Sequence, residues 1–152
     1  MMDEYERYEA ESNKIKKKNK QTMREFHEWL KVKEYTAKTI NVHIRNIDFY
    51  INVFLIYYDI CKPEDGAHKI DSFLGYWFIH KAMWATVSSI KTYGTSFKYF
   101  YTFLHEKGLI DEDKLIDLKR VIKETMPEWL QALDRYDNFE EYEDEDEDED
   151  EG

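Results

Sequence analysis

This 152-residue sequence contains little cysteine, proline or glycine, and each shortage excludes a class of protein. Cys61 is the only cysteine, which excludes an internal disulfide and a zinc site built from cysteines. We expect it to be a small core residue near a helix end. Two prolines and five glycines are too few turn residues for a sheet of many strands. No apolar run approaches the roughly 18 residues that cross a membrane, and no secretory signal is visible. We therefore expect a cytoplasmic protein without membrane contact.

Residue groupings that carry catalysis or bind metals are also missing. The five histidines are scattered, and none forms an HExxH pair. We expect His43 and His105 to be packed or surface residues, not ligands. There is no Gly-rich phosphate loop and no GxSxG. The acidic C-terminal run lacks the glycine that a calcium-binding EF-hand loop needs at its sixth position, so it promises only diffuse cation binding. The sequence predicts no enzyme, no cofactor and no metal site.

Charge is distributed very unevenly along the chain. Residues 138–152, NFEEYEDEDEDEDEG, hold eleven of the 33 acidic residues and no Lys or Arg. The formal net charge of -11 belongs to this tail, because the other 22 acidic residues equal the 22 basic ones in number. We divide the chain into a charged N-terminal arm (1–18), a helical domain (19–137) and an acidic tail (138–152). Mutual repulsion of the carboxylates predicts that the tail is disordered.

Apolar residues recur at three- and four-residue steps and predict helices over about 20–33, 37–60, 67–81 and 86–107. The expected apolar face of the second helix is Ile40, Ile44, Ile47, Ile51, Phe54, Leu55 and Tyr58. That of the fourth is Ile90, Tyr93, Phe97, Phe100, Tyr101 and Leu104. Thr36 is the expected N-cap of the second helix, and Gly108 is expected to end the fourth. Asp111 would cap a fifth helix, which we expect Pro127 to interrupt before a short last helix over Glu128 to Leu133. No strand pattern appears. The predicted fold is all-α: a compact bundle of four main helices plus one or two short C-terminal helices.

The order of these segments carries a family resemblance. FHEWL comes first, followed by the long helix TAKTINVHIRNIDFYINVFL, the short helix IDSFLGYWF, and TVSSIKTYGTSFKYFYTFLHEKGLID. This series resembles the N-terminal SAM-like, core-binding domain of tyrosine recombinases, the phage-integrase family. The resemblance covers roughly two thirds of the chain and lies in helix order and aromatic spacing. It implies a bundle of four or five helices that forms half of a clamp around DNA.

One departure from that family is large. Its catalytic residues are an Arg, a Lys, a His-x-x-Arg pair and a nucleophilic Tyr, and they belong to a second domain that follows the first. Here no His is followed three residues later by Arg, and the acidic tail comes next. The resemblance therefore implies a DNA-gripping module without catalytic function, an accessory or regulator of DNA recombination or integration.

The family grips DNA with its second and fourth helices, so the polar faces of those segments are the candidate DNA-binding surface. The predicted contacts are short polar or basic side chains at helical spacing that can reach phosphates: Lys38, Asn41, Arg45, Lys91, Thr95 and Lys98. An ordinary solvated helix face would look similar. A domain of zero net charge also predicts weak DNA binding unless the protein dimerises or works beside a recombinase-type partner. The discriminating observation is whether the cations converge without Asp48, Glu106 and Glu112 among them.

An alternative function is a protein–protein interaction module that kept the fold without DNA binding. It is favoured by a surplus of aromatic residues that one core need not hold: Tyr50, Tyr57, Tyr76, Tyr99 and Trp84. The tail also leaves two possibilities. It either solubilises the protein passively, or folds over Lys14–Lys20 or Lys91 and Lys98 and competes with DNA.

Overall fold

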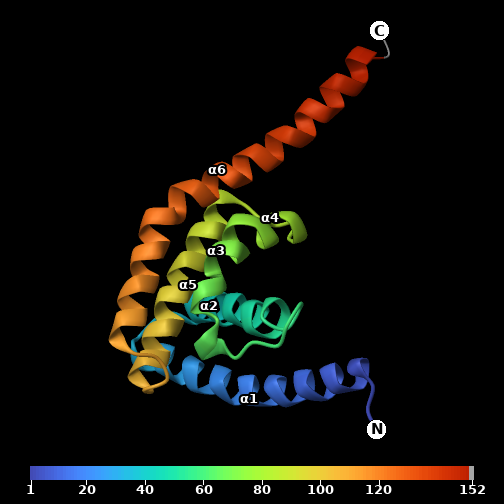
Figure 1. The fold of residues 1–152 in the computed structure, drawn as a ribbon. Helices are drawn as coiled ribbons and strands as arrows, with labels where there is room; N and C mark the ends of the chain where they lie inside the picture. Colours follow the sequence, from blue (N-terminus) through green and yellow to red (C-terminus); the bar gives the residue numbers. More distant parts are fainter. Residues whose placement is uncertain (151–152) are drawn as a thin grey trace.

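A computed structural model describes the backbone of residues 1–150 and the side chains of residues 1–139. It is all-helical within that range, as the sequence predicts. Four long helices dominate: α1 (Glu4–Val32), α2 (Ala37–Phe49), α5 (Val87–Glu106) and α6 (Glu112–Asp150). Figure 1 shows α5 beside the first part of α6, with α1 running across the bottom of the view, where α5 ends and α6 begins.

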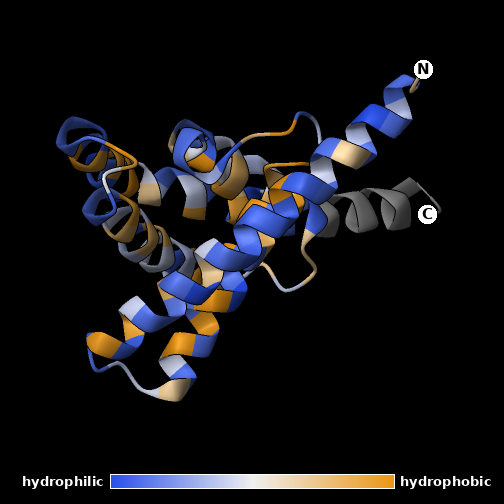
Figure 2. Ribbon diagram, turned by 90° about the horizontal axis from the view of Figure 1, so that it is seen from below, coloured by the Kyte–Doolittle hydropathy of each residue, from blue (hydrophilic) through white to orange (hydrophobic). Residues whose placement is uncertain are grey.

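The predicted N-terminal arm is continuous with the first helix. Asp3 caps α1 by accepting a hydrogen bond from the backbone N–H of Glu6 at 2.8 Å. Within the arm, Ser12 and Ile15 are buried, and the Tyr8 hydroxyl donates to the carbonyl of Ile56. The opposite side of α1, in front in Figure 2, is mostly hydrophilic. Residues 4–18 therefore lengthen α1 and lie over the end of the second helical segment.

The second segment is shorter than predicted, because α2 passes into a π-helical turn, η1 (Tyr50–Phe54). The N–H of Leu55 bonds the carbonyl of Tyr50 at 2.9 Å, and the regular helix ends there, not at Ile60. Tyr58, expected on the apolar face, is consequently 69% exposed. The other residues predicted for that face do point into the core. Ile44 is half-buried, and the rest are buried: Ile40, Ile47, Ile51, Phe54 and Leu55.

The predicted helix over 67–81 is divided into four pieces. They are the 3-10 turn η3 (Ala67–Lys69), α3 (Ile70–Ser72), the π-helical turn η4 (Phe73–Trp77) and α4 (Phe78–Lys81). A further 3-10 turn, η2 (Pro63–Asp65), precedes them. Gly75 lies in η4, where a Cβ would come 3.0 Å from the ring of Trp129. The close approach of α6 and the weak helix propensity of glycine together account for the irregularity.

The C-terminal segment is one helix where the sequence predicted two. Asp111 caps α6 through a 2.8 Å bond from the N–H of Lys114, as expected. Pro127 lies inside α6 and does not end it. A proline removes one backbone hydrogen bond and commonly bends a helix, and α6 changes direction along its course in Figure 1. Trp129 and Leu133 are buried beyond it, so packing holds the helix together. The side chains of 140–152 lie outside the described residues, and the disordered tail stays a prediction.

Two buried tyrosines join the helices to the 3-10 turns. The Tyr50 hydroxyl donates to the carbonyl of Gly66, and the Tyr101 hydroxyl donates to the carbonyl of Pro63, each at 2.8 Å. Cys61, just before these turns, is half-buried, and burial raises the pKa of its thiol. The α5 stripe forms the centre of the core as predicted, with every expected member buried: Ile90, Tyr93, Phe97, Phe100, Tyr101 and Leu104.

Candidate nucleic-acid interface

Caps fix where the two candidate helices begin and therefore which residues share a face. Thr36 caps α2 by accepting a 3.2 Å bond from the N–H of Thr39. Thr86 and Ser89 form a reciprocal capping box at the start of α5. The cap at Thr36 was predicted from the sequence, whereas Thr86 was expected only as the first residue of its helix. Because a helix advances 100° per residue, the two caps set the directions of the polar residues along each helix.

A buried polar network fixes how α2 lies on α5. Ser96 is fully buried, and its hydroxyl donates to the carbonyl of Thr92 at 3.1 Å. That hydroxyl has one proton, so its oxygen accepts from the Asn46 amide at 3.1 Å and from Nδ1 of His43 at 2.6 Å. The bonding pattern assigns the Nδ1–H tautomer to His43. Burial lowers the pKa of His43, which keeps the ring neutral.

A groove of about 430 Å³ opens directly above this network. We call it the α2–α5 groove. Lys38 reaches it from α2 and Lys91 from α5, and among the described residues no Asp or Glu lines it. The Thr95 hydroxyl also lines it but donates to the carbonyl of Lys91 at 3.4 Å. The complete lining is Lys38, Thr39, Val42, His43, Lys91, Thr92 and Thr95.

Arg45 follows Val42 by about one turn of α2 and lines a second hollow of about 500 Å³. This hollow adjoins the α2–α5 groove, because Val42 and Thr92 line both. We call it the Arg45 hollow. Thr86, Ser88 and Ser89 line its other side and bring the N-terminus of α5 to it. The first amides of a helix and its dipole favour anions, so the arginine and the helix end attract the same kind of ligand. No described carboxylate lines this hollow either.

Lys98 and Asn41 do not share these hollows. Lys98 lines a third one of about 710 Å³, which we call the lysine hollow. Asn41 is exposed on α2 and lines none of the three. The predicted set is thus brought together in part: Lys38, Lys91 and Thr95 converge, Arg45 is adjacent, and Lys98 lies beyond them along α5.

The three carboxylates that would weaken a DNA interface, Asp48, Glu106 and Glu112, do not line any of these three hollows. Asp48 accepts a 2.7 Å bond from Asn52 and lines a separate hollow with Lys16, Lys20 and Arg24. Glu106 accepts a hydrogen bond from the indole N–H of Trp29. Glu112 begins α6 and lines none of the three hollows.

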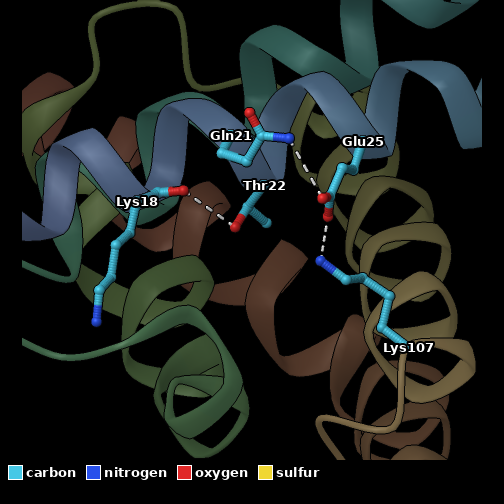
Figure 3. Close-up of polar contacts among 5 residues, drawn as sticks. All are labelled: Lys18, Gln21, Thr22, Glu25 and Lys107. Atoms are coloured by element: carbon cyan, nitrogen blue, oxygen red, sulfur yellow. Dashed lines mark hydrogen bonds and ion pairs between the residues drawn. The ribbon is translucent and has the colours of Figure 1, made fainter.

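Lys107, at the end of α5, is not available as a free cation. Figure 3 shows its ammonium pointing at the carboxylate of Glu25 on α1, which Gln21 also contacts. The hydrogen bond from Lys107 and that from Gln21 lower the pKa of Glu25. This ion pair joins α1 to α5 and marks the end of the cationic side of α5.

Sequence reasoning missed three further cations. Lys33 from the C-cap of α1 and Lys119 and Lys123 from α6 line the lysine hollow together with Lys98. One feature of the sequence could have indicated two of them. Lys119 and Lys123 are four residues apart, on the same side of a helix, and neither has an acidic residue three or four positions away. Their meeting with Lys33 and Lys98 depends on tertiary packing and could not be read from spacing.

The aromatic residues expected in surplus divide between core and surface. Tyr50 is fully buried, so its place in that set was wrong, and Tyr99 is half-buried. Tyr57, Tyr76 and Trp84 are exposed.

Other classes of site leave little trace in the part of the chain that the structure describes. No three or more His, Cys, Asp or Glu side chains gather there as a potential metal site. No helix in that part has the length and apolar character that crossing a membrane requires. No family model matches the sequence, and neither the curated proteins nor the solved structures contain a match.

Proposed function

We propose that this chain is a non-catalytic DNA-binding module that holds the phosphate backbone through the α2–α5 groove and the Arg45 hollow. The observation that carries the proposal is the convergence of Lys38, Arg45 and Lys91 from two helices on adjoining hollows that no described carboxylate lines. The resemblance in helix order to the core-binding domain of tyrosine recombinases supports the same surface. The module would then be an accessory or regulator of recombination or integration.

The dimensions of the surface suit a short contact with a duplex. From Thr86 to Thr95, the part that lines the two hollows, the chain rises about 14 Å at ~1.5 Å per residue, which corresponds to roughly four base-pair steps of ~3.4 Å. Three cations would neutralise about three phosphates, so the binding constant should fall with salt with a slope of about -2.7 on a log–log plot. Such binding is weak, which fits a module that acts as an oligomer or beside a partner protein.

The test is the affinity of the full chain for a fluorescent duplex at about 50 mM and 200 mM salt. The variant Lys38→Gln/Lys91→Gln should bind more weakly and lose roughly two units of salt slope, at ~0.9 per phosphate contact. The matched control is Lys62→Gln/Lys114→Gln. It makes the same change in charge, and Lys114 lies in a hollow lined by Glu64, Asp71 and Asp117. Equal affinity of the two variants for the duplex would contradict the proposal.

A second candidate function, protein–protein interaction, rests on an aromatic surface that borders the Arg45 hollow, because Phe49 and Trp84 also line that hollow. Phe49 and buried Trp77 lie with ring centroids 5.8 Å apart. Exposed Trp84 lies 5.6 Å from Phe49, and exposed Tyr57 lies 5.6 Å from Trp77. The indole N–H of Trp77 is buried and has no partner among the described residues. Tyr57→Ser should abolish partner capture and leave DNA affinity intact if this surface carries the function, because Tyr57 lines neither the Arg45 hollow nor the α2–α5 groove.

A further inference from the structure

The lysine hollow gathers four ammonium groups from three helices around an aromatic wall. Lys33 comes from the end of α1, Lys98 from α5, and Lys119 and Lys123 from α6. No described Asp or Glu lines the hollow. The remaining lining residues are aromatic, apolar or hydroxyl-bearing: Trp29, Tyr35, Tyr99, Thr102, Ile122 and Met126.

The charge arrangement lacks the usual compensation. Among the described carboxylates, none forms an ion pair with any of the four lysines. Lys119 and Lys123 stand at i and i+4 on α6, a spacing at which like charges destabilise a helix by ~0.2–0.5 kcal/mol. Glu106 accepts a hydrogen bond from Trp29 but does not itself line the hollow. A bound polyanion would relieve the repulsion among the lysines.

The aromatic wall offers ring faces beside those charges. The rings of Tyr35 and Tyr99 lie with centroids 5.2 Å apart at 32°. A hydrogen bond with Tyr35 raises the pKa of Tyr99, so the phenol stays neutral beside the lysines. The Lys33 ammonium lies over the Trp29 ring, 5.1 Å from its centroid. Flat bases stack on such rings, and this stacking stabilises the binding of single strands.

The volume of about 710 Å³ lies in the range of small-molecule sites, about 300–1,000 Å³. We infer that the lysine hollow binds a nucleotide, with its phosphates against Lys33, Lys98, Lys119 and Lys123 and its base against the tyrosine and tryptophan rings. The nucleotide is either free or the unpaired residue of a nucleic-acid strand. This inference does not rest on the proposed function, because the hollow and the α2–α5 groove share no lining residue.

Calorimetric titration of the full chain tests the site with four probes: ATP, inorganic tripolyphosphate, adenosine, and a short 5′-phosphorylated single-stranded oligothymidylate. We expect ATP or the oligonucleotide to bind more tightly than tripolyphosphate and adenosine, because only nucleotides engage both lysines and rings. Preference for ATP identifies a free nucleotide, and preference for the oligonucleotide identifies a strand. If tripolyphosphate binds as tightly as both, the base is not recognised and the inference is wrong.

The variant Lys119→Gln/Lys123→Gln should weaken nucleotide binding by at least about tenfold, since charge-assisted hydrogen bonds contribute ~1.5–3 kcal/mol each. Both side chains are exposed, and the change removes a like-charge pair, so thermal unfolding should occur at the same or a higher temperature. The control Lys62→Gln/Lys114→Gln should bind as the unmodified protein does. Duplex affinity measured on the same variants separates the two sites. Unchanged nucleotide binding by Lys119→Gln/Lys123→Gln would overturn the inference, even if Lys38→Gln/Lys91→Gln loses DNA.

Discussion

Nδ1 of His43 lies 2.6 Å from Oγ of Ser96, and this contact joins α2 to α5 beneath the α2–α5 groove. The imidazole also meets the Tyr99 ring edge-on, with centroids 5.0 Å apart. Its neighbours in the groove include two cations, Lys38 and Lys91. A titratable group therefore lies inside the joint that positions the proposed DNA contacts.

The stability of the protein should fall as the pH falls below about 6.5, the ordinary pKa of histidine. The pKa of His43 is lower in the folded protein than in the unfolded chain. Below pH 6.5 the unfolded chain therefore binds more protons, and the free energy of unfolding decreases as the pH falls. The slope from one histidine cannot exceed ~1.4 kcal/mol per pH unit. Urea unfolding at pH 7.5, 6.5 and 5.5 measures it. His43→Gln should lose this component, whereas His68→Gln, at an exposed site, should keep it.

Ser96→Ala should lower the free energy of unfolding by roughly 1–3 kcal/mol, because it leaves the buried ring N–H of His43 and the half-buried amide of Asn46 without their shared partner. Chemical denaturation at neutral pH is the measurement. Ser88→Ala, on the exposed side of α5, is the matched control and should change little. A Ser96 variant as stable as the control would show that the network does not hold the two helices.

Asp71→Ala should loosen the C-terminal half of α6. The indole N–H of Trp129, a residue only 1% exposed, donates to the Asp71 carboxylate at 2.8 Å. The substitution leaves that N–H unsatisfied, at a cost of about 1–3 kcal/mol. A double-mutant cycle with Trp129→Phe should give a coupling energy of at least ~0.5 kcal/mol, as for other contacting pairs. Strictly additive effects would contradict the contact.

Tyr101→Phe should cost roughly 1–2 kcal/mol of unfolding free energy, because the buried carbonyl of Pro63 loses its donor. Tyr50→Phe should have an effect of similar size through Gly66. Tyr58→Phe is the control, since Tyr58 is 69% exposed and its hydroxyl forms no hydrogen bond with a described residue. If all three variants unfold at the same urea concentration, the turns are held by something other than the two phenols.

Ending the chain after residue 137 distinguishes the two roles of the acidic tail. If the tail competes with DNA, the shortened protein should bind a duplex more tightly at about 50 mM salt, and the difference should shrink at about 200 mM because salt screens the tail. If the tail only solubilises, affinity should not change at low salt. Fluorescence anisotropy with the same duplex measures both.

Local signals predicted the fold where one residue type decides the structure. Thr36 and Asp111 cap helices as expected, because a side-chain oxygen beside a free amide is a short-range feature. Gly108 ends α5 with a positive φ of 80°, which glycine adopts without strain. These elements depend on neighbours within about four residues, which a sequence displays directly.

Elements that depend on distant contacts were predicted less well. Pro127 predicted a break, but Trp129 and Leu133 are buried against the rest of the domain and keep α6 continuous. The candidate site shows the same difference between local patterns and distant contacts. Lys38 and Lys91 meet because α2 and α5 each present one polar face, which spacing predicts. Lys33 joins Lys119 and Lys123 only through the crossing of α1 and α6, for which no local pattern exists.

The two π-helical turns, η1 and η4, have a consequence for the lengths that this chain can tolerate. A π turn carries one more residue than the α turn it replaces; η1 carries it at the end of α2, and η4 carries it between α3 and α4. Related sequences one residue shorter within 50–54 or 73–77 would therefore keep the same arrangement of helices with ordinary α turns. A deletion inside α2 or α5 would instead rotate every later side chain by about 100°.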